Sequence, residues 1–321
     1  MIEYYVASGI IAFFVTYMLT KVLIPRLKKA GLTGNDVNKI GRPEVAEMGG
    51  IAIVAGFSAG MLLAIFFHTF LGFDLNLIQL LAATITIFII ALIGMVDDLL
   101  DMPQWLKALV PLFAAIPLVA INVGTTTMSI PFIGAIDFGI LYVLVLIPIA
   151  IAVPSNLTNM LAGFNGMEAG MGAIMFAVML LIGISHGSVE VSIISASMMF
   201  ALLAFLFFNV YPAEIFPGDV GNLTIGVVLA STVIIGNYEA AGAILVIPYV
   251  IDFFIKVYNR FPTSKWWGEN RHGKLYPVDN RVRGFAQLIM KLSNGITEKN
   301  LVMVFLGMEA AVGIIVLVLY L

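Results

Sequence analysis

The stretch that decides the fold is residues 76–101, which read NLIQLLAATITIFIIALIGMVDDLLD. Residues 76–96 carry no charged side chain, and three aspartates follow within the last five positions. A helix needs about 20 apolar residues to cross the hydrocarbon core of a bilayer. The stretch therefore predicts a membrane-spanning helix with polar chemistry at one of its ends.

Apolar runs of this kind recur along the whole chain. It has 321 residues, of which 61% are hydrophobic and only 11% are charged, whereas a soluble domain has about 25% charged residues. We predict an all-α polytopic membrane protein that forms a single domain over residues 1–321. Its ten predicted transmembrane helices are 3–24, 49–70, 76–96, 104–123, 138–155, 167–185, 190–209, 221–236, 239–258 and 299–320.

Positive charge is confined to alternate connections between these helices. All sixteen Lys and Arg residues lie in or beside Lys21–Arg42, Lys107, Lys256–Arg283 and Lys291–Lys299. By the positive-inside rule this face is cytoplasmic, so both termini are predicted outside and the protein is placed in the cell membrane. The five cytoplasmic loops are Pro25–Met48, Asp97–Pro103, Ser155–Gly166, Tyr211–Gly221 and Asn259–Lys299. An active site would be built from these loops, on the cytoplasmic face.

The sharpest local signal is the acidic run at the inner end of the third predicted helix. Asp97 and Asp101 are four residues apart, so a helix would place them on one face. Carboxylates beside a bilayer cost free energy unless a cation pairs with them or a proton neutralises them. The run, with Lys107 after it, therefore indicates a site for Mg²⁺ or for proton transfer, and the alternative is a solvated helix end.

A second signal combines amides and glycines at the inner end of the fifth predicted helix. Asn156 and Asn159 are three residues apart, and Gly163 and Gly166 follow before Glu168. Amide oxygens are hard ligands suited to Mg²⁺, and glycine lets the backbone approach a ligand closely. The alternative is an ordinary helix C-terminus with an Asn/Gly cap.

A third signal is a tight turn at the start of the eighth predicted helix. Phe216-Pro217-Gly218 precedes Asp219, and a Pro-Gly turn would present this carboxylate where the helix dipole favours an anion. Simple N-capping by Asp219 is the alternative. Capping does not explain why three polar elements share one face of the membrane.

The last cytoplasmic loop is long and basic. It contains Arg271 and His272, with Trp266 and Trp267 near its start. Loops of this length are often functional, although basic loops also contact anionic lipids. Opposite three acidic or amide motifs, the Arg-His pair indicates a clamp on phosphate.

Together these motifs predict phosphoryl chemistry between two anionic partners. Two unit charges of like sign 4 Å apart repel by about 4 kcal/mol at an effective dielectric constant of 20, so a metal and cationic side chains must offset that repulsion. The chain contains no Walker A motif and no kinase glycine loop. A lipid phosphate is the natural second substrate in a membrane, and no nucleic-acid partner is expected.

The motifs together resemble the polyprenyl-phosphate N-acetylhexosamine-1-phosphate transferase family, and in particular its archaeal and eukaryotic branch. That resemblance implies transfer of N-acetylglucosamine-1-phosphate from UDP-N-acetylglucosamine to dolichyl phosphate. UMP would be released, and the reaction would begin lipid-linked glycan assembly. The implied cofactor is Mg²⁺, with Mn²⁺ as an alternative.

Roles for individual residues follow from the family match alone. Asp97, Asp98 and Lys107 are expected to be catalytic, with one aspartate acting as base or nucleophile. Asn159 and Asp219 are expected to hold the metal. Phe216 is expected to stack on uracil, whose edge would meet Asn165. The full set of expected substrate-binding residues is Asn35, Val37, Glu47, Asp101, Asn156, Asn165, Glu168, Phe216, Arg271 and His272.

Departures from the family pattern leave substrate alternatives open. Bacterial enzymes of peptidoglycan synthesis have aspartates in place of Asn165 and Glu168, which disfavours the cell-wall substrate. Gly273 stands where the eukaryotic pattern has a second arginine, so another UDP-HexNAc donor or undecaprenyl phosphate remains an alternative. A cation-coupled transporter, with Asp252 and Glu309 as its intramembrane charges, is an alternative of a different class. A homodimer is a further alternative for the oligomeric state.

Overall fold

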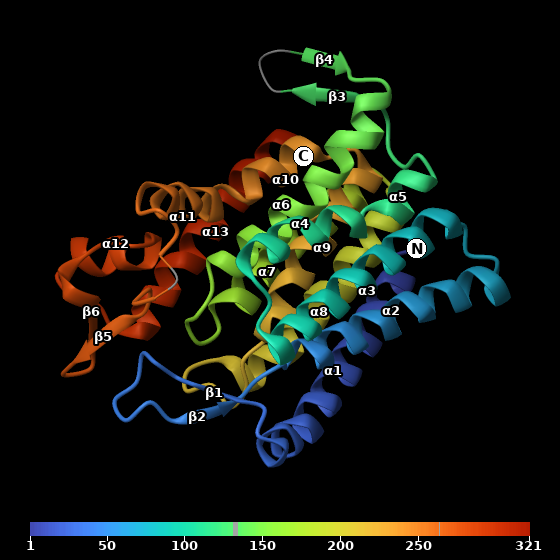
Figure 1. The fold of residues 1–321 in the computed structure, drawn as a ribbon. Helices are drawn as coiled ribbons and strands as arrows, with labels where there is room; N and C mark the ends of the chain where they lie inside the picture. Colours follow the sequence, from blue (N-terminus) through green and yellow to red (C-terminus); the bar gives the residue numbers. More distant parts are fainter. Residues whose placement is uncertain (131–133, 263) are drawn as a thin grey trace.

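Helices dominate the computed structural model, which describes residues 1–130, 134–262 and 264–321 (Figure 1). Eight spans are long and apolar enough to cross a membrane, and this confirms a mostly helical, polytopic membrane protein. They are α1 (Ile2–Ala30), α2 (Gly50–Leu71), α3 (Leu77–Leu100), η1 (Tyr142–Leu146) continued by α6 (Ile147–Met160), α7 (Met167–Ser185), α8 (Val189–Asn209), α9 (Gly218–Gly236) and α13 (Glu298–Tyr320).

The other two predicted helices are interrupted. Residues 239–258 form α10 (Glu239–Leu245) and α11 (Ile247–Tyr258), which are bent by 59° at a break just before Pro248, in the first turn of α11. Proline has no N–H to continue the hydrogen bonding of the preceding helix. The segment predicted as 104–123 forms the short helices α4 (Gln104–Ala114) and α5 (Ile116–Ala120). Up to nine spans therefore meet the length criterion in the described residues, and the tenth stays a prediction.

The stretch that opened the sequence analysis becomes α3, and polar residues set both of its ends. The Asn76 side chain accepts a hydrogen bond from the Gln79 N–H at 3.1 Å, which caps the first turn. At the other end Asp101 adopts a left-handed conformation with φ 49°, and the helix stops there. The acidic run therefore lies on the last turn of a membrane-spanning helix.

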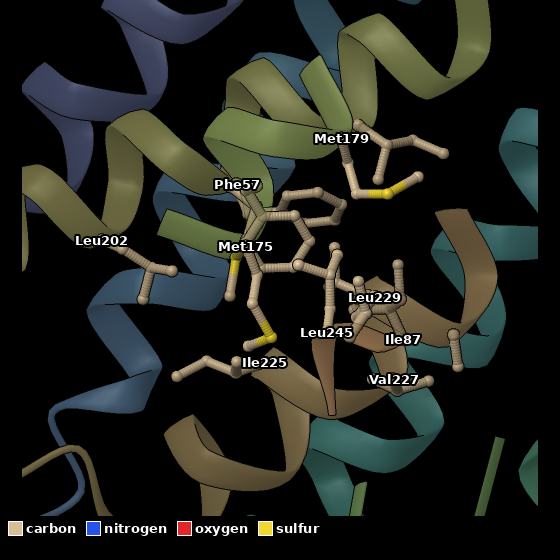
Figure 2. Close-up of a cluster of buried hydrophobic side chains, with 14 of the residues drawn as sticks. Phe57, Ile87, Met175, Met179, Leu202, Ile225, Val227, Leu229 and Leu245 are labelled. Carbon is tan, nitrogen blue, oxygen red and sulfur yellow. The ribbon is translucent and has the colours of Figure 1, made fainter. Parts of the chain in front are cut away.

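The core is formed around α9, and 94% of its apolar span is buried, against 28% for α1. Figure 2 shows side chains from α7, α8 and α9 meeting Phe57 of α2 and Ile87 of α3. The inner end of α9 is especially close to its neighbours, because a Cβ added to Gly94 would lie 2.6 Å from the Val220 Cα. This contact fixes α3 beside the start of α9, where Asp219 lies.

Three short hairpins cover the ends of the bundle. β1 (Thr33–Asn35) pairs with β2 (Glu44–Ala46), and β5 (Gly268–Arg271) pairs with β6 (Lys274–Pro277). Both lie at the lower left of Figure 1, at the opposite end of the bundle from the β3–β4 hairpin. The connection between α11 and α13 also contains the 3₁₀ turn η2 (Val278–Asn280) and helix α12 (Phe285–Leu292).

In the sequence, Thr125–Ile130 and Phe132–Ile136 flank Pro131, which favours a small hairpin. β3 (Thr127–Ile130) does pair with β4 (Gly134–Asp137), in an antiparallel register that joins Thr127 to Asp137. Residues 131–133 of the predicted turn lie outside the described residues.

The predicted topology has a direct test, because the protein contains no cysteine. Thr127, on the β3–β4 hairpin, and Lys274, on β6, are both exposed. Single Thr127→Cys and Lys274→Cys variants in sealed vesicles should be labelled by an impermeant maleimide from opposite sides. The unmodified chain is the background control. Labelling of both variants from the same side would contradict the ten-helix arrangement.

Candidate active site

A cavity of about 1290 Å³ opens at the end of the bundle where α6 ends and α9 begins. Polar groups from β1, α4, α6 and α9 line one part of it, whereas the other part is apolar. The apolar part includes Trp105, Leu112, Val153, Phe253 and Phe254. Trp105 and Phe254 are 66% and 64% exposed, so this part of the wall continues onto the surface that faces lipid in a membrane-spanning bundle.

Most of the predicted site residues meet in this one cavity. Those that line it are Asn35, Val37, Glu47, Lys107, Asn156, Asn159, Glu168, Phe216 and Asp219. Three others contact residues of the cavity wall from behind: Asp97, Asp98 and Asn165. The remaining three are exposed outside the cavity: Asp101, Arg271 and His272. The last turn of α3 thus contributes carboxylates that support the cavity rather than line it.

Asp97 is bound to the one cationic side chain that α4 contributes to the cavity. Its Oδ2 lies 2.6 Å from the Lys107 Nζ, and its Oδ1 accepts the Met102 N–H at 2.9 Å. The carboxylate is almost completely buried, with 1% of its side chain exposed. Lys107 also lies 3.5 Å from an Asp219 carboxylate oxygen, so it is held between two carboxylates at the cavity wall.

Asp98 instead supports the first turn of α9. Its Oδ1 accepts the N–H of Asp219 at 2.7 Å, and its Oδ2 accepts the N–H of Val220 at 3.1 Å. The first N–H groups of a helix have no partner within the helix, and a carboxylate there also complements the helix dipole. Gly218 leaves the space for this contact, since a Cβ there would lie 2.6 Å from Asp98 Oδ2. Asp98 therefore fixes the position of Asp219.

A set of oxygen donors suited to a hard cation faces the cavity. The Asn159 Oδ1 accepts a hydrogen bond from the Asn222 Nδ2 at 3.2 Å, and Asn222 follows Asp219 by one helical turn. The Oδ1 of Asn222 is buried and has no hydrogen-bond partner among the described residues. Buried polar atoms are rarely left without a partner. An orphaned amide oxygen beside Asn159 and Asp219 fits a cation that the protein would hold there.

The donor set has the composition that Mg²⁺ prefers when a substrate supplies the remaining ligands. In the described part of the chain, no three His, Cys, Asp or Glu side chains converge as a metal cage. Mg²⁺ in phosphoryl-transfer sites is commonly held by one or two carboxylates, waters and substrate phosphates. Asp219 and the amides Asn159 and Asn222 fit that pattern. Asn222 was not predicted, although its spacing of three from Asp219 would have shown it.

Phe216 is held at the cavity by backbone pairing with β2. Its N–H donates to the Ala46 carbonyl at 2.8 Å, and its carbonyl accepts the Gly49 N–H at 2.8 Å. Ala46 also forms a parallel bridge with Ile215. Because both sides of the peptide are bound, the ring is presented to the cavity from a fixed backbone.

The loop between α1 and α2, which was predicted to be cytoplasmic, closes the cavity opposite α6. A Cβ added to Gly34 would lie 3.0 Å from a carboxylate oxygen of Glu47, so β1 packs directly on that side chain. Burial raises the pKa of Glu47. The Asn38 Nδ2 donates to the Gly163 carbonyl at 2.8 Å, which joins this loop to the turn after α6.

The Asn165 amide is bound within the protein. Its Nδ2 donates to Asp36 Oδ2 at 3.1 Å, and its Oδ1 accepts from Lys39 Nζ and from the Ala213 N–H, both at 3.0 Å. The predicted contact between this amide and uracil would therefore require these bonds to break. The contact stays a prediction.

Lys256 is a cavity-lining cation that the motifs did not reveal. It lies 2.8 Å from Asp252 on α11 and donates to the Met160 carbonyl at the end of α6. Arg271 points instead to Glu269 at 2.7 Å, on the exposed β5–β6 hairpin. Asp252, considered above for a transporter, is thus paired, whereas Glu309 is buried without a hydrogen-bond partner among the described residues.

Comparisons with known proteins show the family of this chain. The model of the family described as glycosyl transferase family 4 matches residues 80–237. A Saccharolobus solfataricus protein is 37% identical over 313 residues, which cover 97% of this chain and 95% of that protein; it is provisionally named UDP-N-acetylglucosamine–dolichyl-phosphate N-acetylglucosaminephosphotransferase. A Dictyostelium discoideum protein with this name is 25% identical over 96% of this chain and 88% of its own length.

A bacterial relative carries a different name. The phospho-N-acetylmuramoyl-pentapeptide-transferase of Halalkalibacterium halodurans is 30% identical over 261 residues, which cover 76% of this chain and 78% of the bacterial protein. Similarity to the first two proteins thus extends over more of this chain than similarity to the bacterial one.

Proposed function

Because this chain belongs to glycosyl transferase family 4, we propose that it transfers N-acetylglucosamine-1-phosphate from UDP-N-acetylglucosamine to dolichyl phosphate or a related polyprenyl phosphate. The observation that carries this proposal is the two-sided cavity. A polar part with Lys107 and Asp219 adjoins an apolar part that reaches the lipid-facing surface. Such a cavity suits a water-soluble sugar nucleotide and a lipid phosphate at the same time.

The donor would lie over the polar part. Uracil would stack on Phe216, and the pyrophosphate would lie beside Asp219 and Lys107, whose charged atoms are 3.5 Å apart. When bound, Mg²⁺ would offset negative charge on the pyrophosphate, and Asn159, Asn222 and Asp219 would hold it. Lys107 provides a positive charge near the same group. Its ion pair with Asp97 keeps the ammonium at the wall.

The acceptor would lie along the apolar part of the cavity. Its isoprenoid chain would contact α4, α6 and α11, where Leu112, Val153 and Phe253 form the wall. Lys256 lies at the cavity end of α11 and supplies a second cation near the expected lipid phosphate. In this arrangement the phosphate would lie at the inner face of the membrane, with the site on the cytoplasmic side.

The reaction is a substitution at phosphorus. An oxygen of the lipid phosphate attacks the β-phosphorus of the donor and forms the new P–O bond, while the bond from that phosphorus to the bridging oxygen breaks. UMP leaves with the electron pair, and the product is a lipid-pyrophosphate-sugar. Asp97 and Asp98 position Lys107 and Asp219 in this scheme, and direct action of either one as base stays a prediction.

Reconstitution of the purified protein tests the proposal. Radiolabelled UDP-N-acetylglucosamine and dolichyl phosphate should give a labelled lipid and one UMP per product. UDP-N-acetylgalactosamine, UDP-N-acetylmuramoyl-pentapeptide and undecaprenyl phosphate identify the donor and acceptor preferences. Product from none of these pairs would contradict the transferase assignment.

Phe216→Ala should weaken donor binding without unfolding the protein. Stacking of a base on an aromatic side chain contributes about 1–3 kcal/mol, so the Kd for UDP should rise by about 5- to 150-fold. Phe216→Trp, which keeps an aromatic face, is the matched control and should retain most of the affinity. An unchanged Kd for Phe216→Ala in titration calorimetry would rule out the stacking role.

A further inference from the structure

Two of the described residues that line the cavity carry a positive charge, Lys107 on α4 and Lys256 on α11. Lys107 lies 3.5 Å from Asp219, on the side where the metal and the donor pyrophosphate are expected. Lys256 lies on the helix that also contributes Phe253 and Phe254 to the apolar part of the wall. Because two phosphates repel each other as they approach, each of them needs positive charge nearby. Lys256 is placed to supply that charge to the acceptor.

The Lys256 ammonium is held at the wall by two partners. Its Nζ lies 2.8 Å from the Oδ2 of Asp252, one helical turn earlier on α11, and it donates to the Met160 carbonyl at the end of α6. A lysine ammonium has three N–H donors, and the described residues supply partners for two of them. The side chain is 15% exposed and lines the cavity, so the third N–H can bind a group that enters the cavity.

The bond to Met160 brings this ammonium beside the expected metal site. Met160 directly follows Asn159, one of the expected Mg²⁺ ligands, in the last turn of α6. A lysine at this point also caps the C-terminus of α6 and complements its dipole. Capping does not require a lysine to line a cavity, however, and Lys256 does so. A phosphate bound to Lys256 would therefore lie close to the group that it must attack.

The order of side chains along α11 matches the order of groups in an isoprenoid phosphate. Val250, Phe253 and Lys256 are spaced by three residues, and all three line the cavity. Side chains three apart on a helix share one face and are separated by about 4.5 Å along the axis. An isoprenoid chain that contacts Val250 and Phe253 would thus bring its terminal phosphate to Lys256.

Asp252 fixes the ammonium without facing the cavity itself. Its side chain is 2% exposed, and its Oδ1 accepts the N–H of Phe285, the first residue of α12, at 2.7 Å. A Cβ added to Gly284 would lie 2.9 Å from this oxygen, so the start of α12 packs directly on the carboxylate. Since both oxygens have partners, the negative charge stays behind Lys256. The ion pair therefore presents its cationic end to the cavity.

We propose that Lys256 binds the terminal phosphate of the acceptor, so that the apolar part of the cavity selects an isoprenoid phosphomonoester, and that Asp252 is the positioning residue for this ammonium. The inference rests on the proposed function for the isoprenoid nature of the acceptor. Lys256 has no bond to Lys107 or Asp219, which lie on α4 and α9. Its loss should therefore weaken acceptor binding and leave donor binding largely unaffected.

The first test compares the two substrates in steady-state kinetics. Lys256→Met should raise the KM for dolichyl phosphate by about 10-fold or more, the scale of one lost hydrogen bond between charged groups, and change the donor KM less than about twofold. Lys256→Arg should recover part of the acceptor affinity. A purely structural ion pair would affect both substrates or neither. An unchanged acceptor KM in an active Lys256→Met variant would overturn the proposal and leave the transferase function intact.

Arg260→Met is the matched control. Arg260 is exposed, lies four residues after Lys256 and does not line the cavity. This substitution removes the same charge near the same helix end, so the acceptor KM should remain as in the wild type. Equal effects of Arg260→Met and Lys256→Met would reduce the role of Lys256 to bulk electrostatics and contradict the proposal.

The second test is independent of turnover and uses two short probes, farnesyl phosphate and farnesol. In calorimetry the wild-type protein should bind the phosphate at least about tenfold more tightly than the alcohol, and Lys256→Met should bind both alike. An unchanged affinity for farnesol would show that the apolar wall is intact. If Lys256→Met does not fold, the double variant Lys256→Met/Asp252→Asn removes both buried charges and keeps an oxygen for the Phe285 N–H. It should also fail to distinguish the probes.

The probes also separate this inference from the proposed function. Equal binding of the two probes by the wild type, or a preference for the phosphate that survives the loss of Lys256, would overturn the inference. A wild-type protein that is inactive as a transferase but prefers farnesyl phosphate through Lys256 would contradict the proposed function and support the phosphate site.

Discussion

Lys107→Met is expected to lower kcat by about 10²–10³-fold, the loss typical of removing one group that stabilises charge in a transition state. The ammonium lies 2.6 Å from Asp97 and 3.5 Å from Asp219, at the wall of the cavity. It is positioned to offset charge on the donor pyrophosphate as the bond to UMP breaks. Lys107→Arg keeps the charge and should retain more activity than Lys107→Met.

The same substitution should also destabilise the fold, because it leaves the Asp97 carboxylate buried without its cation. Breaking a buried pair by removing one partner typically costs about 3–5 kcal/mol. The double variant Lys107→Met/Asp97→Asn removes both charges and should recover much of this stability in a thermal melt. Its kcat should remain as low as that of Lys107→Met. Recovery of activity in the double variant would show that Lys107 has only a structural role.

Sequence patterns predicted the location of the site because its residues lie at helix ends. Asp97, Asn159 and Asp219 each follow or precede an apolar run, and alternation of the runs brings all three to one face. The contact between Gly94 and Val220 then brings α3 and α9 together, so that separate motifs share one cavity. The pattern of apolar runs and polar ends along the sequence therefore predicted most of the architecture.

The spacing of the motif residues in the sequence did not predict which contacts each side chain makes. Asp97 and Asp98 are adjacent in sequence, yet their side chains diverge, one toward Lys107 and the other toward the N–H groups of α9. Lys256 lines the cavity from α11, which is bent by 59° from α10, and the spacing of the motifs does not indicate this bend. The motif residue Arg271 forms an ion pair with Glu269 on the same hairpin.

Residues 104–123 show how a prediction from composition can overestimate the length of a helix. The run is apolar apart from Gln104, Lys107 and Asn122, but α4 ends at Ala114 and α5 ends at Ala120, with Pro117 in the first turn of α5. Prolines are tolerated in transmembrane helices where neighbouring groups compensate for the lost hydrogen bonds. Hydropathy alone could not show that this helix would be short and would form one wall of the site.

Asp219→Asn should differ sharply from Asp98→Asn, although the Asp98 carboxylate accepts the backbone N–H of Asp219. Asp219 lines the cavity beside the orphaned oxygen of Asn222, and we expect it to hold Mg²⁺. Changing even groups that only support a metal ligand costs about 10–100-fold in metal affinity or activity, so losing a ligand's charge should cost at least as much. Asp219→Asn should therefore lose about 10²-fold in rate at fixed Mg²⁺, and excess Mg²⁺ should restore part of it.

Asp98→Asn acts on the fold of the site and should not respond to the metal. Its two oxygens accept the N–H groups of Asp219 and Val220, and an amide would place an N–H donor against one of them. A buried donor left without an acceptor costs about 1–3 kcal/mol, so this variant should melt earlier as well as turn over more slowly. Mg²⁺ titration of the two variants side by side decides the assignment. If excess Mg²⁺ restores Asp98→Asn as fully as Asp219→Asn, the carboxylate that holds the metal has been misassigned; if neither variant loses activity, the last turn of α3 and the first turn of α9 form only a solvated helix junction.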